Sequence, residues 1–353
     1  MRKVLLLVPI IIYSLLLPMQ IASAASPFDT REHVINDMLT STVNAGGPNT
    51  PRRQRYAATT TSVEREFTLA EKKTVPAERT TKRSGFFLSG GYNFYHMDYK
   101  EYSLYERSGG ARRVIDQDYG NLHGLYISFG LKSDFYIDTL KGKPFVEAYY
   151  QDYRTSSATY DGGYSNGITD RPLVTGDNRE RIRFYGLKLG AENYVTEKIE
   201  TFYYFDIGRR TWDRGQNRII KAGSDLVADY HEKYWWTYFG VGGGFNYDLT
   251  QKLRVGVNAE FMLAPDRFTW MYADNNELTY DLGTVWGTEI ELPVKYQLSR
   301  HISLDVTPYF NYWKIEKSDL VFVGNDGMYD WYTYEPDSKL YATGVRAGLT
   351  CIF

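Results

Sequence analysis

From Phe86 to the end of the chain, apolar and polar residues alternate with a period of two. Between Leu253 and Leu263, for example, every odd position is apolar, whereas the even positions include Arg254, Asn258 and Glu260. Because successive side chains of a β-strand point to opposite faces, this pattern predicts strands with one apolar and one polar face. The alternation recurs in ten segments separated by turn-like stretches, which indicates an all-β domain.

The lengths of the connections decide between a soluble sandwich and a membrane barrel. Short links at residues 138–143, 195–198, 248–252 and 299–301 alternate with long polar links at about 101–120, 155–180, 213–233, 265–284 and 316–339. Strict alternation of this kind is typical of an up-and-down barrel with periplasmic turns and extracellular loops. The segments also have the length of about 9–11 residues that a tilted strand needs to cross a bilayer. We therefore expect a ten-stranded antiparallel up-and-down transmembrane β-barrel.

The first 24 residues have the organisation of a signal peptide. Arg2 and Lys3 precede an apolar run, and an Ala-Ser-Ala sequence ends at Ala24, where we expect cleavage. The alternative is a transmembrane anchor, but Pro9 and Pro18 interrupt the run, which is short for a span.

Residues 25–83 differ in composition from the rest of the chain. Thr, Arg, Ala, Pro and Glu dominate, with ten basic and seven acidic side chains. Because so few apolar residues are available for a core, we expect a flexible, disordered periplasmic linker. The predicted organisation is thus a signal peptide at 1–24, a linker at 25–83 and a barrel at 84–353.

Composition excludes several classes of function. The mean hydropathy of −0.45 excludes a helical membrane protein, and the net charge of −2 gives no reason to expect a nucleic-acid partner. One cysteine, five scattered histidines and the lack of a glycine-rich phosphate loop suggest no metal site and no cofactor.

Aromatic residues concentrate at the ends of the predicted strands, where an interfacial girdle is expected. This predicted girdle comprises Tyr92, Phe94, Tyr95, Tyr149, Tyr150, Tyr203, Tyr204, Trp235, Trp236, Tyr247, Trp270, Trp286, Tyr296, Tyr312 and Tyr341. Pro308 lies within the ninth segment, and since proline cannot donate a ladder hydrogen bond, we expect a bulge there.

The last segment carries a more specific pattern, in which Val345, Ala347, Leu349, Cys351 and Phe353 share one face. It resembles the C-terminal strand of Gram-negative outer-membrane proteins, although Cys351 stands where an apolar or aromatic residue is commoner. The resemblance implies location in the cell outer membrane. It also implies that Phe353 is the signal read by the barrel-assembly machinery.

If the apolar face meets lipid, the opposite face fills the barrel with nearly balanced charges. The predicted lumen charge network comprises Lys132, Glu147, Lys188, Glu192, Asp206, Arg210, Arg254, Glu260, Glu289, Glu291, Lys295, Asp305 and Arg346. Buried charges are tolerated when paired, and an open aqueous channel needs about 16 strands. We therefore expect a largely plugged lumen with at most a narrow porin-like solute path, along a crevice that inward glycines such as Gly242 and Gly344 leave open.

Two short acidic motifs in the long loops suggest an enzymatic alternative. Asp116 and Asp118 end the first loop, and Asp229 and His231 end the third. The motifs resemble the Asp-x-Asp and Asp-x-His pairs of the omptin proteases, which are ten-stranded outer-membrane barrels. The resemblance implies that a water held between the two pairs is activated for peptide hydrolysis. The omptin pairs lie on the second and fourth loops, however, so this is the alternative hypothesis.

The preferred hypothesis is non-enzymatic. It describes a structural or surface-binding barrel whose five long loops, rich in Tyr, Asp and Gly, contact an extracellular ligand. The expected partners are outer-membrane lipid and lipopolysaccharide, the barrel-assembly machinery and that ligand.

Overall fold

The computed structural model describes residues 84–353 except 107–111, 163–173, 216–218, 223–224, 228–230, 274–276 and 326–329. The predicted signal peptide and linker, together with Asp229, therefore lie outside the described residues. In the part of the chain that is described, no helix is long and apolar enough to cross a membrane.

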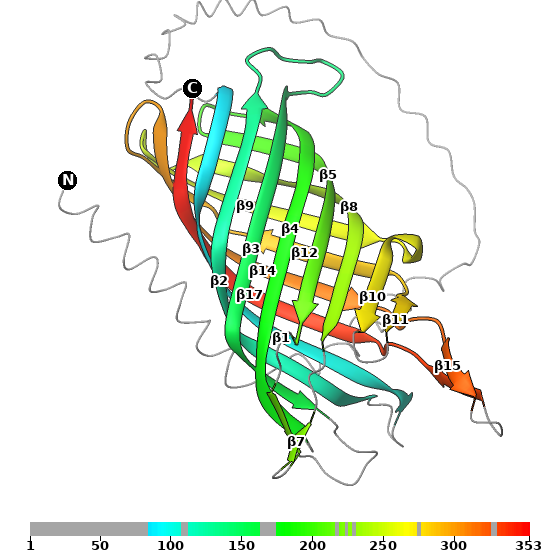
Figure 1. Cartoon of the computed structure of the whole chain (residues 1–353). Coiled ribbons are helices and arrows are strands. Elements are labelled where there is room, and N and C mark those ends of the chain that lie inside the picture. The colour runs from blue at the N-terminus through cyan, green and yellow to red at the C-terminus, as the bar shows by residue number, and fades with distance from the viewer. Residues whose placement is uncertain are drawn as a thin grey trace, which may run out of the picture. The chain divides into compact units, whose positions relative to one another are not determined.

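Ten antiparallel strands close into a barrel within the described residues, which confirms the predicted fold class (Figure 1). They are β1 (Gly85–Glu106), β2 (Arg112–Lys132), β3 (Lys143–Gly162), β4 (Val174–Tyr194), β5 (Ile199–Arg214), β8 (Glu232–Asp248), β9 (Leu253–Ala264), β12 (Val285–Glu291) continued by β13 (Val294–Gln297), β14 (Ile302–Ile315) and β17 (Ser338–Ile352). Each strand pairs with its neighbours in sequence, and the pairing of β1 with β17 closes the barrel.

The short turns gather at one end of the barrel, here called the turn end, and the long connections at the other, the loop end. Short additional elements lie in the long connections: β6 (Ile219–Ala222), β7 (Asp225–Val227), the 3₁₀ helix η2 (Asp266–Phe268), β10 (Thr269–Ala273), β11 (Leu278–Asp281), β15 (Val321–Asn325) and β16 (Asp330–Thr333). The turn end is periplasmic and the loop end extracellular in barrels of this kind.

Several strands continue well beyond the length that a bilayer requires. The β1–β2 ladder pairs Glu101 with Asp116 and Tyr102 with Val114, so much of the predicted first loop is strand. The prediction of a loop over 101–120 is wrong to that extent. Inward side chains on these extensions are buried, and this packing stabilises the additional ladder.

The outer face of the barrel carries the apolar side of each strand. On β2, Leu125, Ile127, Phe129 and Leu131 are exposed, with Leu125 at 65% of its full accessible surface. So large an apolar surface is stable only against hydrocarbon, and a closed barrel leaves no strand edge unpaired there. We call this surface the apolar belt.

The expected bulge at Pro308 is wrong. Pro308 pairs in register with Val345, and the interruption lies instead on the neighbouring strand, between β12 and β13. There the backbone N–H of Leu292 donates to the carbonyl of Pro308 at 2.9 Å. Pro293 and Pro308 both lack an N–H, and the ladder is interrupted where Leu292 lies opposite Pro308 and Pro293 lies opposite Thr307, without a register shift.

Candidate functional site

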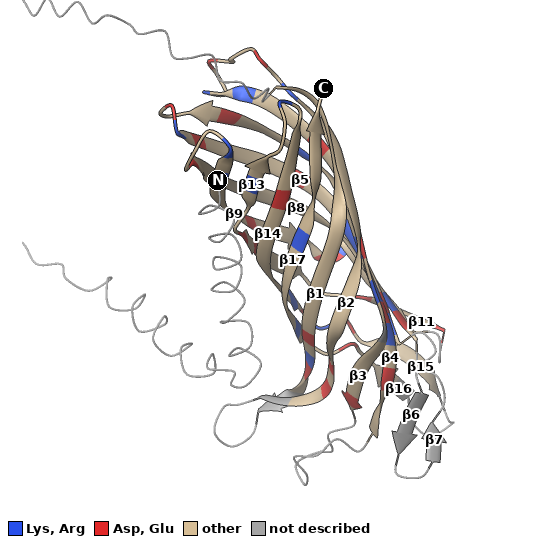
Figure 2. Cartoon of the chain, turned by 90° about the vertical axis from the view of Figure 1, so that its left-hand side faces the viewer, with Lys and Arg blue, Asp and Glu red and all other residues tan. Residues whose placement is uncertain are grey.

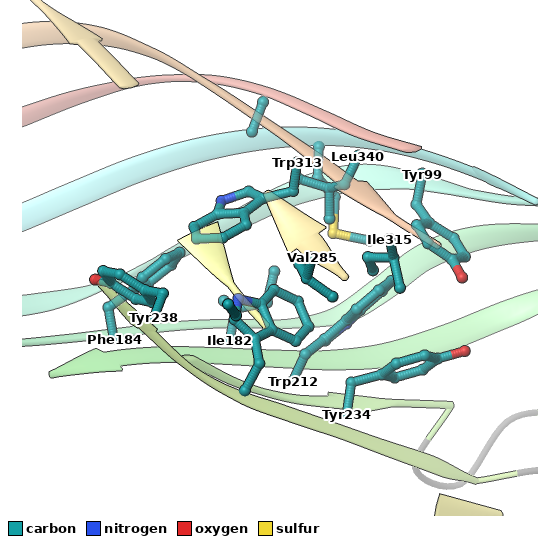
Figure 3. Packing of buried hydrophobic residues seen from close by; sticks show 14 of the residues in the cluster. Tyr99, Ile182, Phe184, Trp212, Tyr234, Tyr238, Val285, Trp313, Ile315 and Leu340 are labelled. Atoms are coloured by element: carbon teal, nitrogen blue, oxygen red, sulfur yellow. The ribbon is translucent and has the colours of Figure 1, made fainter. Parts of the chain in front are cut away.

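The half of the lumen toward the loop end is filled by a buried layer of aromatic side chains (Figure 3). We call this layer the aromatic plug; its largest members are Tyr99, Tyr153, Trp212, Tyr234, Trp236, Tyr238 and Trp313, all 0–2% exposed. The ring centroids of Trp236 and Trp313 are 5.4 Å apart, and those of Tyr238 and Trp313 are 5.5 Å apart. Inward positions on neighbouring strands lie side by side, so a few bulky residues span the narrow interior.

The aromatic plug corrects the predicted girdle. Tyr92, Phe94, Tyr150 and Tyr203 are exposed on the outer wall, as expected. Tyr95, Tyr204 and Trp236 are buried in the lumen instead. The reason is the period of two: adjacent aromatic residues such as those at 94–95, 203–204 and 235–236 must point to opposite faces.

Arg210 lies within this aromatic layer. Its guanidinium carbon is 4.7 Å from the ring centroid of Phe184, 5.2 Å from that of Trp236 and 5.3 Å from that of Trp313. Among the described residues no carboxylate lies within ion-pair distance of it. Cation–π contact with the faces of three rings provides its stabilisation.

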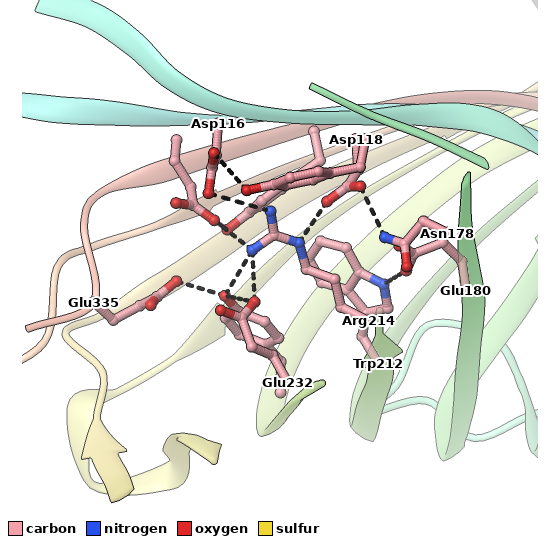
Figure 4. A network of polar contacts seen from close by, with 12 residues as sticks. Asp116, Asp118, Asn178, Glu180, Trp212, Arg214, Glu232 and Glu335 are labelled. Atoms are coloured by element: carbon pink, nitrogen blue, oxygen red, sulfur yellow. Dashed lines mark hydrogen bonds and ion pairs between the residues drawn. The ribbon is translucent and has the colours of Figure 1, made fainter. Parts of the chain in front are cut away.

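Beyond the plug, close to the loop end, one arginine collects several carboxylates from separate strands (Figure 4). Arg214, the last residue of β5, lies 2.5 Å from an oxygen of each of Glu101, Asp118 and Glu232. Asp116 lies 4.0 Å from the same guanidinium. We call Arg214, Glu101, Asp116, Asp118, Glu232 and Glu335 the Arg214 cluster, since Tyr234 joins Glu335 to Glu232 by hydrogen bonds.

Neighbouring polar groups hold the carboxylates in place. Tyr160 donates to Asp116 at 2.9 Å, and the side-chain amide of Asn178 donates to Asp118 at 2.8 Å. The five carboxyl groups of the cluster share one guanidinium in a buried space outside the apolar belt. Repulsion between their negative charges therefore favours the protonated form of some of them. Burial raises the pKa of Glu101 to about 8 and that of Asp116 to about 6, and it also raises the pKa of Glu335.

The cluster contains the first of the two predicted omptin-like pairs. Asp118 is 0% exposed and bonded to Arg214 and Asn178, whereas the half-buried His231 directly precedes Glu232 of the cluster. The structure thus brings Asp116 and Asp118 together with Glu232, the residue after His231, around the guanidinium of Arg214. Asp229 is outside the described residues.

Sequence reasoning missed Arg214 and Glu101 because both fall in segments predicted as loops. The available signal was continued alternation: Asp206, Gly208, Arg210, Trp212 and Arg214 occupy successive inward positions of β5. Among the described residues no group of three or more His, Cys, Asp or Glu side chains is arranged to hold a metal ion.

In the half of the lumen toward the turn end, the charged residues form ion pairs around a cavity of about 240 Å³. Lys132 lies 2.6 Å from Glu192, Lys188 lies 3.0 Å from Glu260, and Arg346 contacts Glu291. Arg254 lies 2.9 Å from both Glu200 and Asp248, and Lys295 lies 3.9 Å from Asp305.

The remaining members of the predicted network have other surroundings. Asp206 accepts a hydrogen bond from Tyr149 at 2.7 Å, and Glu289 accepts one from Asn311 at 3.0 Å. Glu147 lines the cavity. Glu200 and Asp248, which pair with Arg254, were not among the residues predicted from the sequence.

Inward glycines make room for side chains and not for a crevice along the strands. A Cβ atom at Gly242 would lie 2.4 Å from the ring of Tyr204, and one at Gly344 would lie 2.4 Å from the ring of Tyr309. The tyrosine hydroxyls reach across to polar partners, as Tyr204 does to Glu260 at 3.0 Å. The expected crevice is occupied at these positions.

The closed barrel, its apolar belt and the alternation of short turns with long loops define an integral β-barrel protein of the Gram-negative outer membrane. No protein-family model and no curated protein matches the chain.

Solved structures with a similar fold are outer-membrane barrels. The outer-membrane protease OmpT from Escherichia coli gives a TM-score of 0.49 at 10% identity, covering 78% of this chain and 100% of OmpT. OprG from Pseudomonas aeruginosa gives 0.31 at 11% identity, covering 78% of this chain and 98% of its own. Neisserial surface protein A gives 0.29 at 11% identity, with coverage of 76% and 98%.

Proposed function

We propose that this protein is a non-conducting outer-membrane barrel whose loop end is a binding surface. The observation that carries the proposal is the aromatic plug. Trp212, Trp236 and Trp313 are each 0% exposed and lie between the turn-end cavity and the Arg214 cluster. A solute on that route would have to displace a packed apolar layer and then a buried guanidinium with its carboxylates.

The loop end offers apolar contact area outside the apolar belt. On the segment that leads into β15 and on the β15–β16 hairpin, Leu320, Phe322, Val323 and Tyr332 are 49–69% exposed. Apolar side chains gathered on a projecting hairpin are typical of a surface that contacts another molecule. The proposed ligand is therefore an extracellular macromolecule with an apolar contact patch.

Planar-bilayer recording of the full mature chain tests the blocked lumen. The expected result is that the bilayer shows no conductance steps. Protection of the barrel from protease serves as the independent check that the protein has inserted. A variant with Phe322→Ser and Tyr332→Ser tests the surface and should lose attachment of intact cells to immobilised extracellular proteins. Steady conductance steps from the unaltered protein would contradict the proposal.

The omptin-like protease remains the second candidate, supported by the placement of His231 beside Glu232 of the Arg214 cluster. In omptins, as the resemblance implies, the aspartate pair positions a water; here Asp118 accepts hydrogen bonds from Arg214 and Asn178. We expect no cleavage of a dibasic peptide by the purified barrel. Cleavage that disappears in both Asp229→Ala and His231→Ala would establish the protease instead.

Phe353 is proposed as the signal for barrel assembly. Its ring is 65% exposed at the turn end, while its backbone N–H donates to the carbonyl of Phe86 at 2.8 Å. Strand β17 is therefore anchored to β1 while the terminal ring stays accessible. Phe353→Ala should lower the amount of folded barrel in the outer membrane without changing the stability of the barrel that does assemble.

A further inference from the structure

The outer wall of three neighbouring strands changes abruptly from apolar to charged on the side toward the loop end. Along β4, the outward residues Leu189, Leu187 and Tyr185 are followed by Arg183 and Arg181. On β3, Tyr150 is followed by Asp152 and Arg154, and on β5, Ile207 is followed by Arg209. Figure 2 shows charged residues gathered beside the label of β4. This boundary lies where the apolar belt ends, at the level of the outer-leaflet headgroups.

The charged residues form two adjacent groups, which together we call the outer-wall cluster: Asp152 with Arg154 and Arg181, and Asp213 with Arg183. Arg181 binds Asp152 with two parallel hydrogen bonds of 3.0 and 2.9 Å. Arg154 binds the same carboxylate at 2.5 and 3.2 Å. Beside them, Arg183 donates to Asp213 at 2.8 Å. The guanidinium groups are thus fixed in place before any ligand arrives.

The cluster has more positive charge than its own carboxylates neutralise. Arg154 and Arg181 stand directly opposite each other in the β3–β4 ladder, an arrangement that is unfavourable for like charges. They share the single carboxylate of Asp152, whose side chain is 8% exposed, whereas those of Arg154 and Arg181 are 62% and 36% exposed. The acids are covered and the cations face outward, so the open side of the group attracts an anion.

We propose that the outer-wall cluster binds the phosphate of a phosphorylated lipid in the outer leaflet. Guanidinium groups are planar donors that bind phosphate oxygens in pairs, and a lipid-borne phosphate sits at the height of this cluster when its acyl chains lie along the apolar belt. The neighbouring outward residues Tyr150 and Tyr185 are 38% and 41% exposed and offer aromatic surface to the upper part of the same chains. The proposal does not depend on whether the lumen conducts.

The test compares lipid retention by the folded full-length mature protein in detergent. The probe is lipid A carrying its phosphates, with a dephosphorylated lipid A of the same acyl chains as reference, and bound lipid is counted by native mass spectrometry. The triple variant Arg154→Gln, Arg181→Gln, Arg183→Gln should retain the phosphorylated lipid about tenfold less. Its weak retention of the dephosphorylated lipid should equal that of the unaltered protein.

The matched control is Arg300→Gln, which removes an exposed arginine from a turn at the opposite end and should leave retention unchanged. Folding is checked by the heat-dependent shift in gel mobility, and if the triple variant does not fold, Arg154→Gln alone replaces it, since that side chain is the most exposed of the three. Equal retention of both lipids, or no loss in the variant, would overturn the proposal. Displacement of the lipid by millimolar inorganic phosphate would overturn it as well, because the site would then be one for free phosphate.

Discussion

The two halves of the lumen are filled by different kinds of side chain. Toward the turn end, charged side chains from neighbouring strands pair around a cavity large enough for several waters. Toward the loop end, buried aromatic rings pack against one another, and a buried arginine above them lies within 4.0 Å of four carboxylates, with Glu335 joined through Tyr234. The comparison teaches that a charged lumen and a blocked lumen are separate properties of this barrel. The block comes from apolar packing, and the ion pairs surround the space that remains.

The strongest test of this division removes the plug. The double variant Trp236→Ala, Trp313→Ala should change a silent barrel into one with resolvable conductance steps. It should also lower the free energy of unfolding by about 3–5 kcal/mol per tryptophan, because each ring leaves a large cavity. Single-channel recording and urea unfolding in detergent measure the two effects. Trp286→Ala is the control, since Trp286 lies on the outer wall, stacked on Phe261 and edge-on to Tyr312; conductance in this control would refute the assignment of the block to the plug.

The next largest effect is expected at the two arginine-centred groups. Arg214→Gln leaves several buried carboxylates without their counter-charge and should cost about 3–5 kcal/mol. Arg254→Gln should cost less, because the side chain of Arg254 is 16% exposed and its partner Glu200 lines the cavity. Urea unfolding midpoints give the difference, and limited proteolysis should show new cleavage near the loop end only for Arg214→Gln. Equal losses of unfolding free energy in the two variants would mean that the two halves of the lumen do not differ in hydration.

The sequence predicts the barrel well, because the period of two, the connection lengths and the apolar faces are local properties. The expected list of inward charges rests on the same local pattern, and two of its members, Lys132 and Glu192, form an ion pair of 2.6 Å. It fails for the plug because the position of a ring along the barrel axis depends on strand tilt and register. Trp236 of β8 and Trp313 of β14 lie far apart in sequence, yet their ring centroids are 5.4 Å apart.

The limits of the predicted loops have a related cause. Turn-forming and polar residues indicate where the apolar outer face of a strand ends. The strands β1, β2 and β5 nevertheless continue past that point, with polar residues on their outer faces. Glu101 and Arg214 belong to these extensions, and their contact spans 113 residues of sequence. No local pattern encodes such a pairing.

A smaller loss of stability is expected from substitution of the inward glycines in the half of the lumen toward the turn end, here called the turn half; the other half is called the loop half. Gly242→Ala places a Cβ where the ring of Tyr204 lies and should cost about 1–3 kcal/mol by displacing that ring from Glu260. Gly324→Ala is the matched control, because a Cβ there meets no atom within 4 Å. The urea unfolding midpoints of the two variants measure the difference in stability. If both variants unfold at the same concentration, the glycines leave open space in the lumen and the crevice expected from the sequence exists.

The smallest effect, and the one specific to the loop half, is a change with pH. Glu101 has a pKa of about 8 in the folded barrel, because it is buried and faces Asp116 and Asp118 of β2, Glu232 of β8 and Glu335 as well as Arg214. An unfolded glutamate has a pKa of about 4.3. The folded cluster therefore binds more protons than the open chain, so its stability falls as the pH rises from about 4.3 to about 8 and changes little above that. Asp116 adds a smaller loss that is complete near pH 6.

Hydrogen exchange between pH 5 and pH 9, corrected for the intrinsic rate of each amide, measures this loss locally. Amides of β8 near Glu232 should show an increase in opening of at least about tenfold, the equivalent of one pKa unit, because the difference between the folded and unfolded pKa of Glu101 exceeds one unit. Amides of β9 near Arg254, in the turn half, serve as the internal reference and should change less. Glu101→Gln keeps the shape of the side chain but cannot ionise, so it should flatten the response near Glu232. A response that persists in Glu101→Gln would assign the proton to another member of the cluster, and the absence of any response in the unaltered protein would mean that water reaches the cluster freely.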